Sequence, residues 1–226
     1  MLKIENFSLR LKGSDGRILP VLEDVSLCLD KGRCLGVAGE SGSGKSVLAM
    51  SIAALLPSAS VHSRSGSIEF GNCSILSAGE PELRKLRGHK IGFVFQEPMT
   101  AMNPLMTLYD QIVETVYAHF PACSRSDADT RVMLALDRAG FKEPDKFLSS
   151  YPHQLSGGMR QRAMIAMALI LEPELIIADE PTTAIDAALQ VQLLAGLRRQ
   201  IEQERRSMIF ISHDLGVIRA VSDELA

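Results

Sequence analysis

No stretch of this sequence approaches the roughly 18 consecutive apolar residues that would mark a membrane-spanning helix. The stretch from Met1 to Arg10 lacks the long apolar run of a secretory signal. Internal repeats and low-complexity tracts are also missing. We therefore expect that the chain does not cross a bilayer, and that a partner must hold it in place if it works at a membrane.

Cysteine and excess charge are scarce as well. The 4 cysteines form neither a Cys-x-x-Cys pair nor a metal-type spacing, which favours reduced, mostly buried thiols and a cytosolic compartment. The formal net charge is −3. This value argues against a nucleic-acid-binding surface as the main function, although a local basic patch is compatible with it. The cysteines are Cys28, Cys34, Cys73 and Cys123.

The sequence does contain enough apolar material for a sizeable core. Apolar residues make up 46% of the 226 residues, which suits one large α/β domain or one core with an insertion. Short apolar runs alternate with helical patterns, which favours a largely parallel sheet covered on both faces. We expect strands at 2–11, 25–29, 34–38, 91–95, 175–178 and 208–211, helices at 46–56, 158–171 and 189–201, and a loop at 58–66.

The middle of the chain, from about Glu97 to Tyr151, has a different character. It carries Met99, Met102 and Met106, and its patterns indicate helices near 109–119 and 127–139 with a loop at 121–126 between them. We interpret this stretch as a mostly helical insertion, after which the core resumes.

The segment GESGSGKS at 39–46 fits the pattern G-x-x-x-x-G-K-[ST] and lies between a predicted strand and a predicted helix, as this pattern requires. Its glycines let backbone N–H groups point at phosphate oxygens, and the helix N-terminus adds positive potential. Lys45 can place a charge between the β- and γ-phosphates, and the Ser46 hydroxyl can bind Mg²⁺. The segment predicts a nucleoside triphosphate site.

Polar residues also follow three other predicted strands. Asp179 and Glu180 end one of them, where the first carboxylate can hold Mg²⁺ and the second can polarise the attacking water. Gln96 can reach the metal or the water, and His213 can reach the γ-phosphate, because ligands of open α/β sheets bind at the carboxyl edge. Taken alone, residues of these types at the end of a strand are more often solvated surface groups than members of a catalytic site. The phosphate loop favours the functional interpretation.

A second glycine-containing segment, LSGGMRQ at 155–161, opens a predicted helix. Ser156 is a good N-cap, and Gly157 and Gly158 expose backbone donors. Because the chain already has one phosphate cradle, this second helix start suggests a site for the γ-phosphate bound to another subunit. A capped helix without any ligand is the alternative.

In combination these segments resemble the ATP-binding cassette ATPase domain, over nearly the whole chain. The resemblance rests on 39–46, Gln96 and 155–161, on IIADEPTTAID at 176–186 and on ISHD at 211–214. The strings QEPMTAMNPLMTL at 96–108 and SSYPHQLSGGMRQR at 149–162 are similar to the dipeptide, oligopeptide and nickel importer branch.

The resemblance implies a single domain, 1–226, of the α/β class. It implies a P-loop NTPase core (about 1–96 and 152–226) with a mostly parallel sheet, N-terminal antiparallel strands, and an inserted helical subdomain (about 97–151) that contacts a permease.

The resemblance also implies a role for each motif residue. Lys45, Glu180 and His213 are expected to be catalytic, with Glu180 as general base and His213 as γ-phosphate switch. Ser46, Gln96 and Asp179 are expected to hold Mg²⁺. The expected ATP-contacting set, which includes Asp186 in a loop crossing the dimer, is Gly39, Glu40, Ser41, Gly42, Ser43, Gly44, Lys45, Ser46, Gln96, Ser156, Gly157, Gly158, Asp179 and Asp186.

Three departures from the family pattern affect these expectations. Leu11 stands where the family often stacks an aromatic residue on adenine, so base stacking is expected to be weaker. Ile185 stands where the family usually has leucine. The chain stops at Ala226, where the family continues, so we expect a truncated C-terminal end.

The leading expectation is an ATPase subunit that powers uptake of a peptide or nickel-type cargo at the cytoplasmic face of a bacterial inner membrane. Its expected partners are a second ATPase subunit, two permease subunits and an extracytoplasmic solute-binding protein, but no nucleic acid. The alternative is a soluble cassette ATPase that acts on nucleic acid or ribosomes, although no tandem cassette, coiled-coil arm or zinc module is visible. A regulatory module without turnover is disfavoured by the presence of both Glu180 and His213.

Overall fold

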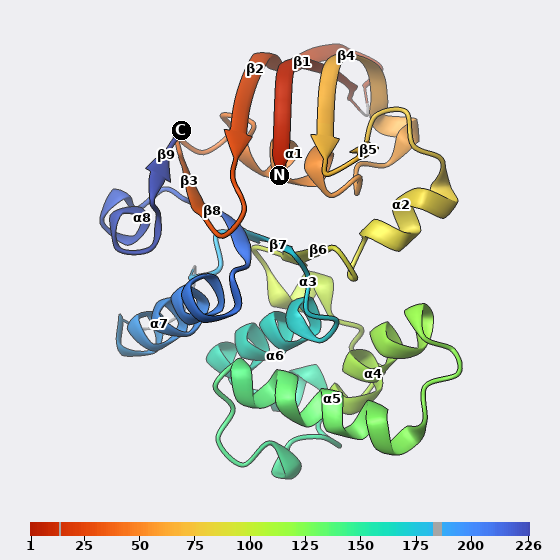
Figure 1. Ribbon diagram of the computed structural model, residues 1–226, viewed down its shortest axis with the longest axis vertical. Coiled ribbons are helices and arrows are strands. Elements are labelled where there is room, and N and C mark those ends of the chain that lie inside the picture. Colours follow the sequence, from red (N-terminus) through yellow and green to blue (C-terminus); the bar gives the residue numbers. More distant parts are fainter. Residues whose placement is uncertain (14, 183–186) are drawn as a thin grey trace.

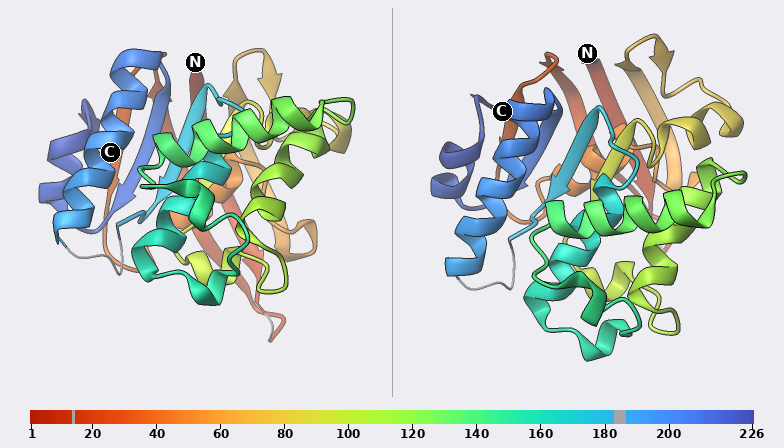
Figure 2. Two further views of the ribbon diagram at one scale, coloured as in Figure 1. Left: turned by 90° about the horizontal axis from the view of Figure 1, so that it is seen from below. Right: turned by 60° about the horizontal axis from the view of Figure 1, so that its bottom comes forward.

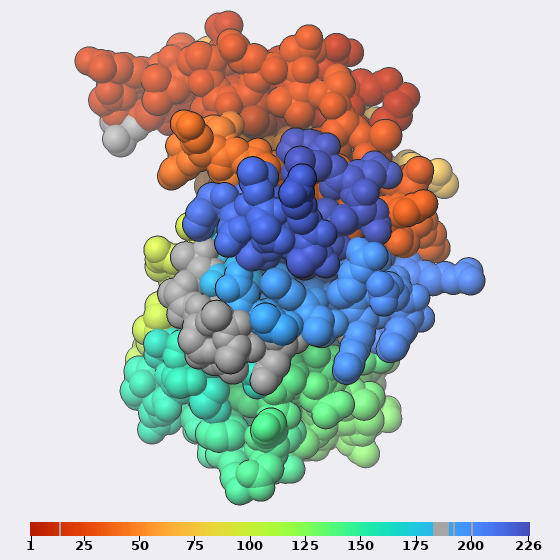
Figure 3. Space-filling model, turned by 90° about the vertical axis from the view of Figure 1, so that its left-hand side faces the viewer, coloured from red at the N-terminus to blue at the C-terminus, as the bar shows by residue number. Residues whose placement is uncertain are grey.

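The computed structural model describes residues 1–13, 15–182 and 187–226. An antiparallel sheet, a parallel sheet and a group of helices follow one another along the long axis of the molecule (Figures 1 and 3). The strand order is β2-β1-β4-β5 in the antiparallel sheet and β6-β7-β8-β3-β9 in the parallel sheet. Both the mainly parallel core and the N-terminal antiparallel strands were expected from the sequence.

The bounds of the elements are as follows. The antiparallel sheet contains β1 (Leu2–Lys12), β2 (Ile18–Leu29), β4 (Val61–Phe70) and β5 (Cys73–Ser74), and the parallel sheet contains β3 (Cys34–Ala38), β6 (Ile91–Val94), β7 (Leu175–Asp179), β8 (Ser207–Ser212) and β9 (Glu224–Leu225). The α-helices are α1 (Lys45–Ile52), α2 (Glu80–Leu86), α3 (Pro98–Ala101), α4 (Leu108–His119), α5 (Arg125–Arg138), α6 (Gly157–Leu169), α7 (Ala187–Glu204) and α8 (Leu215–Val221).

The central parallel strands separate two hydrophobic cores. In β8, Ile209 and Ile211 join the cluster that contains α1 and the antiparallel sheet, whereas Met208 and Phe210 join the cluster that contains α6, α7 and α8. Every residue of β8 is buried. Because both faces are covered, the strand appears in the sequence as a continuous apolar run rather than an alternating one.

A third cluster joins α4 and α5 to α6, and these helices lie together in both views of Figure 2. Leu108, Leu136 and Ala163 belong to this cluster. The helix α5 begins at Arg125, two residues before its expected start, because the Ser124 side chain caps it by accepting a hydrogen bond from the Asp127 amide. The division of the chain into core and helical subdomain stays a prediction.

The prediction of a loop at 58–66 is wrong for most of that segment. Residues 58–60 form a short 3₁₀ turn, and β4 begins at Val61. The first half of β4 is largely exposed and pairs through its backbone with β1, for example Ser65 with Ser8. Because no face of this half is buried, it has none of the apolar alternation that identifies a strand.

We expect Gly66→Ala to lower the free energy of unfolding by about 2 kcal/mol, because it meets two penalties at once. The backbone φ at Gly66 is +82°, and an added Cβ would lie 2.3 Å from the Asn6 carbonyl oxygen, where β1 departs from regular pairing. The matched control is Gly71→Ala, which also has positive φ but nothing within 4 Å. Urea unfolding of both variants measures the difference, and equal losses would contradict the packing argument.

Candidate functional site

The predicted site residues follow neighbouring parallel strands. The phosphate loop follows β3, which pairs with β8, and β8 pairs with β7, which pairs with β6. Gln96, Asp179 and His213 lie at the ends of β6, β7 and β8. Because parallel strands end at the same edge of a sheet, residues that are more than 80 positions apart in the sequence come together there.

The phosphate loop is held between β3 and α1 by close packing. Gly44 has a φ of +92°, and a Cβ at this position would lie 2.9 Å from both the Val21 carbonyl oxygen and Leu22 Cδ2. No side chain fits there without a shift of β2. The contact of β2 with this loop was not expected from the sequence, because Val21 and Leu22 precede the strand that was expected at 25–29.

Lys45 bends back over the loop that precedes it. Its Nζ donates hydrogen bonds to the carbonyl oxygens of Gly39 at 2.8 Å and Glu40 at 2.6 Å, and Lys45 is only 9% exposed. The ammonium group therefore lies over the loop at the start of α1, where the backbone N–H groups and the helix field also attract anions. Phosphate oxygens can replace these carbonyl oxygens as acceptors of the Lys45 hydrogen bonds.

Asp179 is the most deeply buried of the predicted site carboxylates that the structure describes, with an exposure of 5%. Burial raises its pKa, the Ser46 hydroxyl opposes the rise by hydrogen bonding, and neighbouring Glu180 adds to it. Among the described residues, no hydrogen-bond partner reaches its Oδ1. A buried carboxylate oxygen without a partner beside a hydroxyl is the donor chemistry that Mg²⁺ takes, so Asp179 and Ser46 fit this metal.

Glu180 contacts both Gln96 and His213, the two predicted side chains that follow β6 and β8. Gln96 Nε2 donates to its Oε2 at 3.2 Å, and His213 Nδ1 lies 3.3 Å from the same oxygen. The backbone at Glu180 has a φ of +45°, and its amide donates to the Ile211 carbonyl. This uncommon conformation turns the carboxylate along the sheet edge toward Gln96 and His213, and His213 itself is 66% exposed.

The second glycine segment lies at the start of α6. The Ser156 side chain caps this helix by accepting from the Met159 amide at 3.3 Å, and both Ser156 and Gly157 are exposed. In the part of the chain that the structure describes, no hydrogen bond or ion pair joins 156–158 to 39–46. Asp186 and Ile185 lie outside the described residues.

Leu11, at the position where the family often has an aromatic residue, is a partly buried residue of β1 that pairs with Leu19 of β2. The adenine contact stays a prediction.

A family model described as ABC transporter matches residues 22–183. The chain belongs to this family. Its structure is similar to the dimeric, post-hydrolysis state of the ATP-binding cassette MJ0796 bound to ADP and Pi, with a TM-score of 0.86, 29% identity, and coverage of 100% of this chain and 96% of that one. The fold and the sequence together make the chain an ABC ATPase domain.

Curated relatives are longer than this chain. It is 46% identical to the uncharacterized ABC transporter ATP-binding protein YejF of Escherichia coli, covering 100% of this chain and 42% of that protein. It is 39% identical to the oligopeptide transport ATP-binding protein OppD of Bacillus subtilis and 42% identical to the dipeptide transport ATP-binding protein DppD of the same organism, covering 100% of this chain and 63% and 67% of those proteins. Within its described part, this cassette has no helix long and apolar enough to span a membrane.

We expect Asp179→Asn to stabilise the nucleotide-free cassette at neutral pH by on the order of 1 kcal/mol, because it removes a buried charge without a full set of partners. The pKa of folded Asp179 is raised, so its destabilising effect is present above that pKa and fades as the pH falls toward 3.8, the ordinary value.

Thermal unfolding of the original chain and of Asp179→Asn, at pH values from neutral down to 3.8, measures the difference in stability. The control is Asp145→Asn, which changes an exposed carboxylate. A stabilisation that is equal in both variants, or that does not shrink in acid, would contradict the burial of the Asp179 charge.

Proposed function

We propose that this cassette binds and hydrolyses ATP with Mg²⁺ to power the uptake of peptides through separate membrane subunits. The observation that carries the proposal is the convergence of Lys45, Asp179, Glu180, Gln96 and His213 at one sheet edge. The printed names of the relatives OppD and DppD refer to oligopeptide and dipeptide transport, which supports a peptide cargo over the nickel-type cargo.

Each converging residue has a distinct part in the proposed reaction. Lys45 and the loop N–H groups bind the β- and γ-phosphates, and Glu180 accepts a proton from the attacking water and orients it. Gln96 and His213, both in contact with Glu180 Oε2, fix the direction of that carboxylate. Asp179 and Ser46 hold the metal. Mg²⁺, when bound, neutralises developing charge on the phosphate oxygens.

The exposed start of α6 supports a reaction shared between two subunits. Ser156 and the glycines after it present backbone donors to solvent and make no contact with their own phosphate loop among the described residues. We propose that they bind the γ-phosphate held by a second ATPase subunit, so that two ATP molecules lie between head-to-tail subunits. ATP then favours the closed dimer because only that form satisfies both half-sites.

Apolar side chains beside Gln96 support contact with a membrane subunit. Phe95, Met99 and Leu105 are exposed, the last by 85%. A small cavity of about 200 Å³, lined in part by Phe95, Met102 and Met167, opens next to them. We propose that this surface receives one of two permease subunits, at the cytoplasmic face of the inner membrane, and that an extracytoplasmic solute-binding protein delivers the cargo. Movement here reaches Glu180 through Gln96.

We expect Glu180→Gln to lower ATP hydrolysis at least about 100-fold while leaving Mg-ATP affinity within a few-fold of the original value, because it removes the base and keeps the side-chain shape. Phosphate release and calorimetry measure the two quantities, and gel filtration with Mg-ATP is expected to show a trapped dimer.

Glu114→Gln, on the exposed face of α4, is the control and is expected to keep full activity. Unchanged hydrolysis in Glu180→Gln would refute the assignment of the base. Co-purification of the intact protein with ribosomes or nucleic acid instead of membrane subunits would favour the soluble alternative.

We expect Ser156→Arg to abolish turnover while its own phosphate loop still binds ATP normally, because the new side chain blocks the start of α6. The variant also loses a helix cap, which costs about 1 kcal/mol. Ser124→Arg is the matched control, since it removes the equivalent cap of α5 at a site remote from any phosphate motif.

Mixing the inactive variants Ser156→Arg and Lys45→Ala is the sharper form of this test. In a homodimer, each mixed pair has one intact composite site, so up to about a quarter of the original activity is expected to return. If each subunit hydrolysed ATP alone, mixing would restore nothing.

A further inference from the structure

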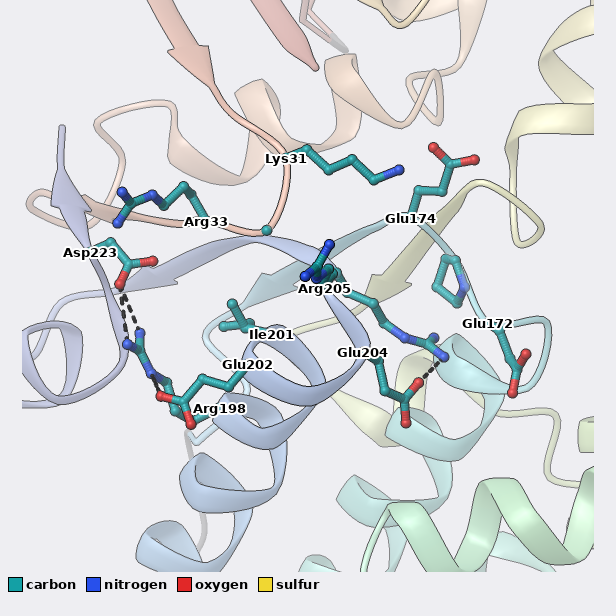
Figure 4. Close-up of a pocket in the computed structure, with 13 residues that line it drawn as sticks. Lys31, Arg33, Glu172, Glu174, Arg198, Ile201, Glu202, Glu204, Arg205 and Asp223 are labelled. Carbon is teal, nitrogen blue, oxygen red and sulfur yellow. Dashed lines mark hydrogen bonds and ion pairs between the residues drawn. The ribbon is translucent and has the colours of Figure 1, made fainter.

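A cavity of about 920 Å³ lies at the opposite edge of the parallel sheet, where β3, β7 and β8 begin. We call it the basal cavity. It is formed by the turn at 31–33, the loop at 172–174, the end of α7 and the residues that follow it, and Asp223 (Figure 4). Its volume suits a small organic ligand. Of the expected nucleotide-site residues that the structure describes, none lines it.

The acidic side chains of the basal cavity are already paired. Each of them forms an ion pair with a nearby cation: Glu172 with Arg138 at 2.6 Å, Glu174 with Lys90, Glu202 with Arg198 at 2.8 Å, Glu204 with Arg206, and Asp223 with Arg198 at 3.2 Å. The pKa of Glu174 is lowered chiefly by its hydrogen bond with Lys90, and the charge of Lys31 contributes less. Four cations thus pair with the five carboxylates, since Glu202 and Asp223 share Arg198, and only one negative charge is left for the remaining cations.

Three cations of the basal cavity are left over. Lys31, Arg33 and Arg205 are exposed, and within the described residues none of them forms an ion pair. Figure 4 shows Lys31 and Arg33 coming from the turn before β3, and Arg205 coming from the chain after α7. Cations from separate loops border one cavity, and after the carboxylate without its own cation is counted they leave an unbalanced positive charge of about two around it.

Arg206 adds a donor that is buried rather than exposed. This arginine is 6% exposed, and its Nη2 pairs with Glu204. In the described structure its Nη1 is buried and has no hydrogen-bond partner. A buried guanidinium donor without an acceptor is costly, and the positive charge of this guanidinium in the wall of the cavity favours an anion there.

The loops that carry these cations are tied to one another by backbone hydrogen bonds. The Gly32 amide donates to Ser207 Oγ at 2.8 Å, the Met208 amide donates to the Arg33 carbonyl at 2.9 Å, and the Ser207 amide donates to the Glu174 carbonyl at 2.9 Å. Ordering the backbone costs little when a ligand binds, because these segments are already fixed in position.

Arg205 has an uncommon backbone conformation within this frame. Its φ of +53° lies in the left-handed region, which few residues with a side chain adopt. A glycine would take this conformation more easily, so Arg205 occupies a position where a side chain lowers the stability of the fold.

We propose that the basal cavity binds a small ligand of the pyrophosphate class, with two or three negative charges. Three unpaired cations match that charge, guanidinium groups pair well with phosphate oxygens, and the volume exceeds what a single ion needs. The ligand is either free pyrophosphate or the diphosphate part of a nucleotide, and it binds independently of the phosphate loop at the far edge of the sheet.

The test uses the Lys45→Ala chain, so that the phosphate loop does not contribute, and titrates pyrophosphate by calorimetry without Mg²⁺. We expect saturable binding of one pyrophosphate per chain that weakens as salt increases. Adding Lys31→Gln and Arg205→Gln is expected to weaken it at least about 10-fold, because two charge-assisted contacts are lost. ADP titrated in the same backgrounds shows whether a nucleotide is accepted as a source of the diphosphate.

The control adds Lys142→Gln and Arg219→Gln instead, which removes one exposed lysine and one exposed arginine elsewhere. Affinity is expected to stay unchanged in this control. No saturable binding, or equal losses in the two double variants, would overturn the proposal. Citrate that binds as tightly as pyrophosphate would overturn the assignment to the pyrophosphate class.

Discussion

In-register parallel pairing of β6, β7, β8 and β3 is the constraint on which the rest of the structure depends. It brings the ends of four separate segments to one edge, where the phosphate loop, Asp179, Glu180, Gln96 and His213 meet. The same pairing divides successive side chains between two cores, so a shift of one residue in β8 would exchange Ile209 and Phe210 between different packing environments. Site geometry and core packing therefore depend on the same register.

The site uses interactions that work against stability. Burial raises the pKa of Asp179, so the charged form of this carboxyl is destabilised, and Glu180 has an uncommon backbone conformation. Each is tolerated because the surrounding sheet and α1 are well packed, with Leu48 buried in the first core. Such features are common where a protein is organised for a ligand rather than for its own folding.

The elements that a local residue pattern marks were predicted from the sequence. Elements that are stabilised mainly by contacts with distant parts of the chain were missed. Apolar runs identified β3, β6, β7 and β8, and the phosphate-loop pattern identified its strand and helix. The first half of β4 was missed because it is exposed, and α2 and α8 were not expected because each is one or two turns long. The candidate site residues were named from motifs, but the meeting of Gln96 and His213 at one oxygen of Glu180 depends on the register of three strands. The basal cavity was not expected, since none of the sequence motifs lies in the segments that line it.

The buried carboxyl of Asp179 has a thermochemical consequence. Because its pKa is raised, a fraction of molecules carries a proton on this group over the pH range in which it titrates, and a cation can bind only after that proton has left. Metal uptake is then accompanied by proton release to the buffer. Within that pH range, the heat measured on loading the cassette varies with the ionisation enthalpy of the buffer, and further acidification weakens loading at constant metal and nucleotide concentrations.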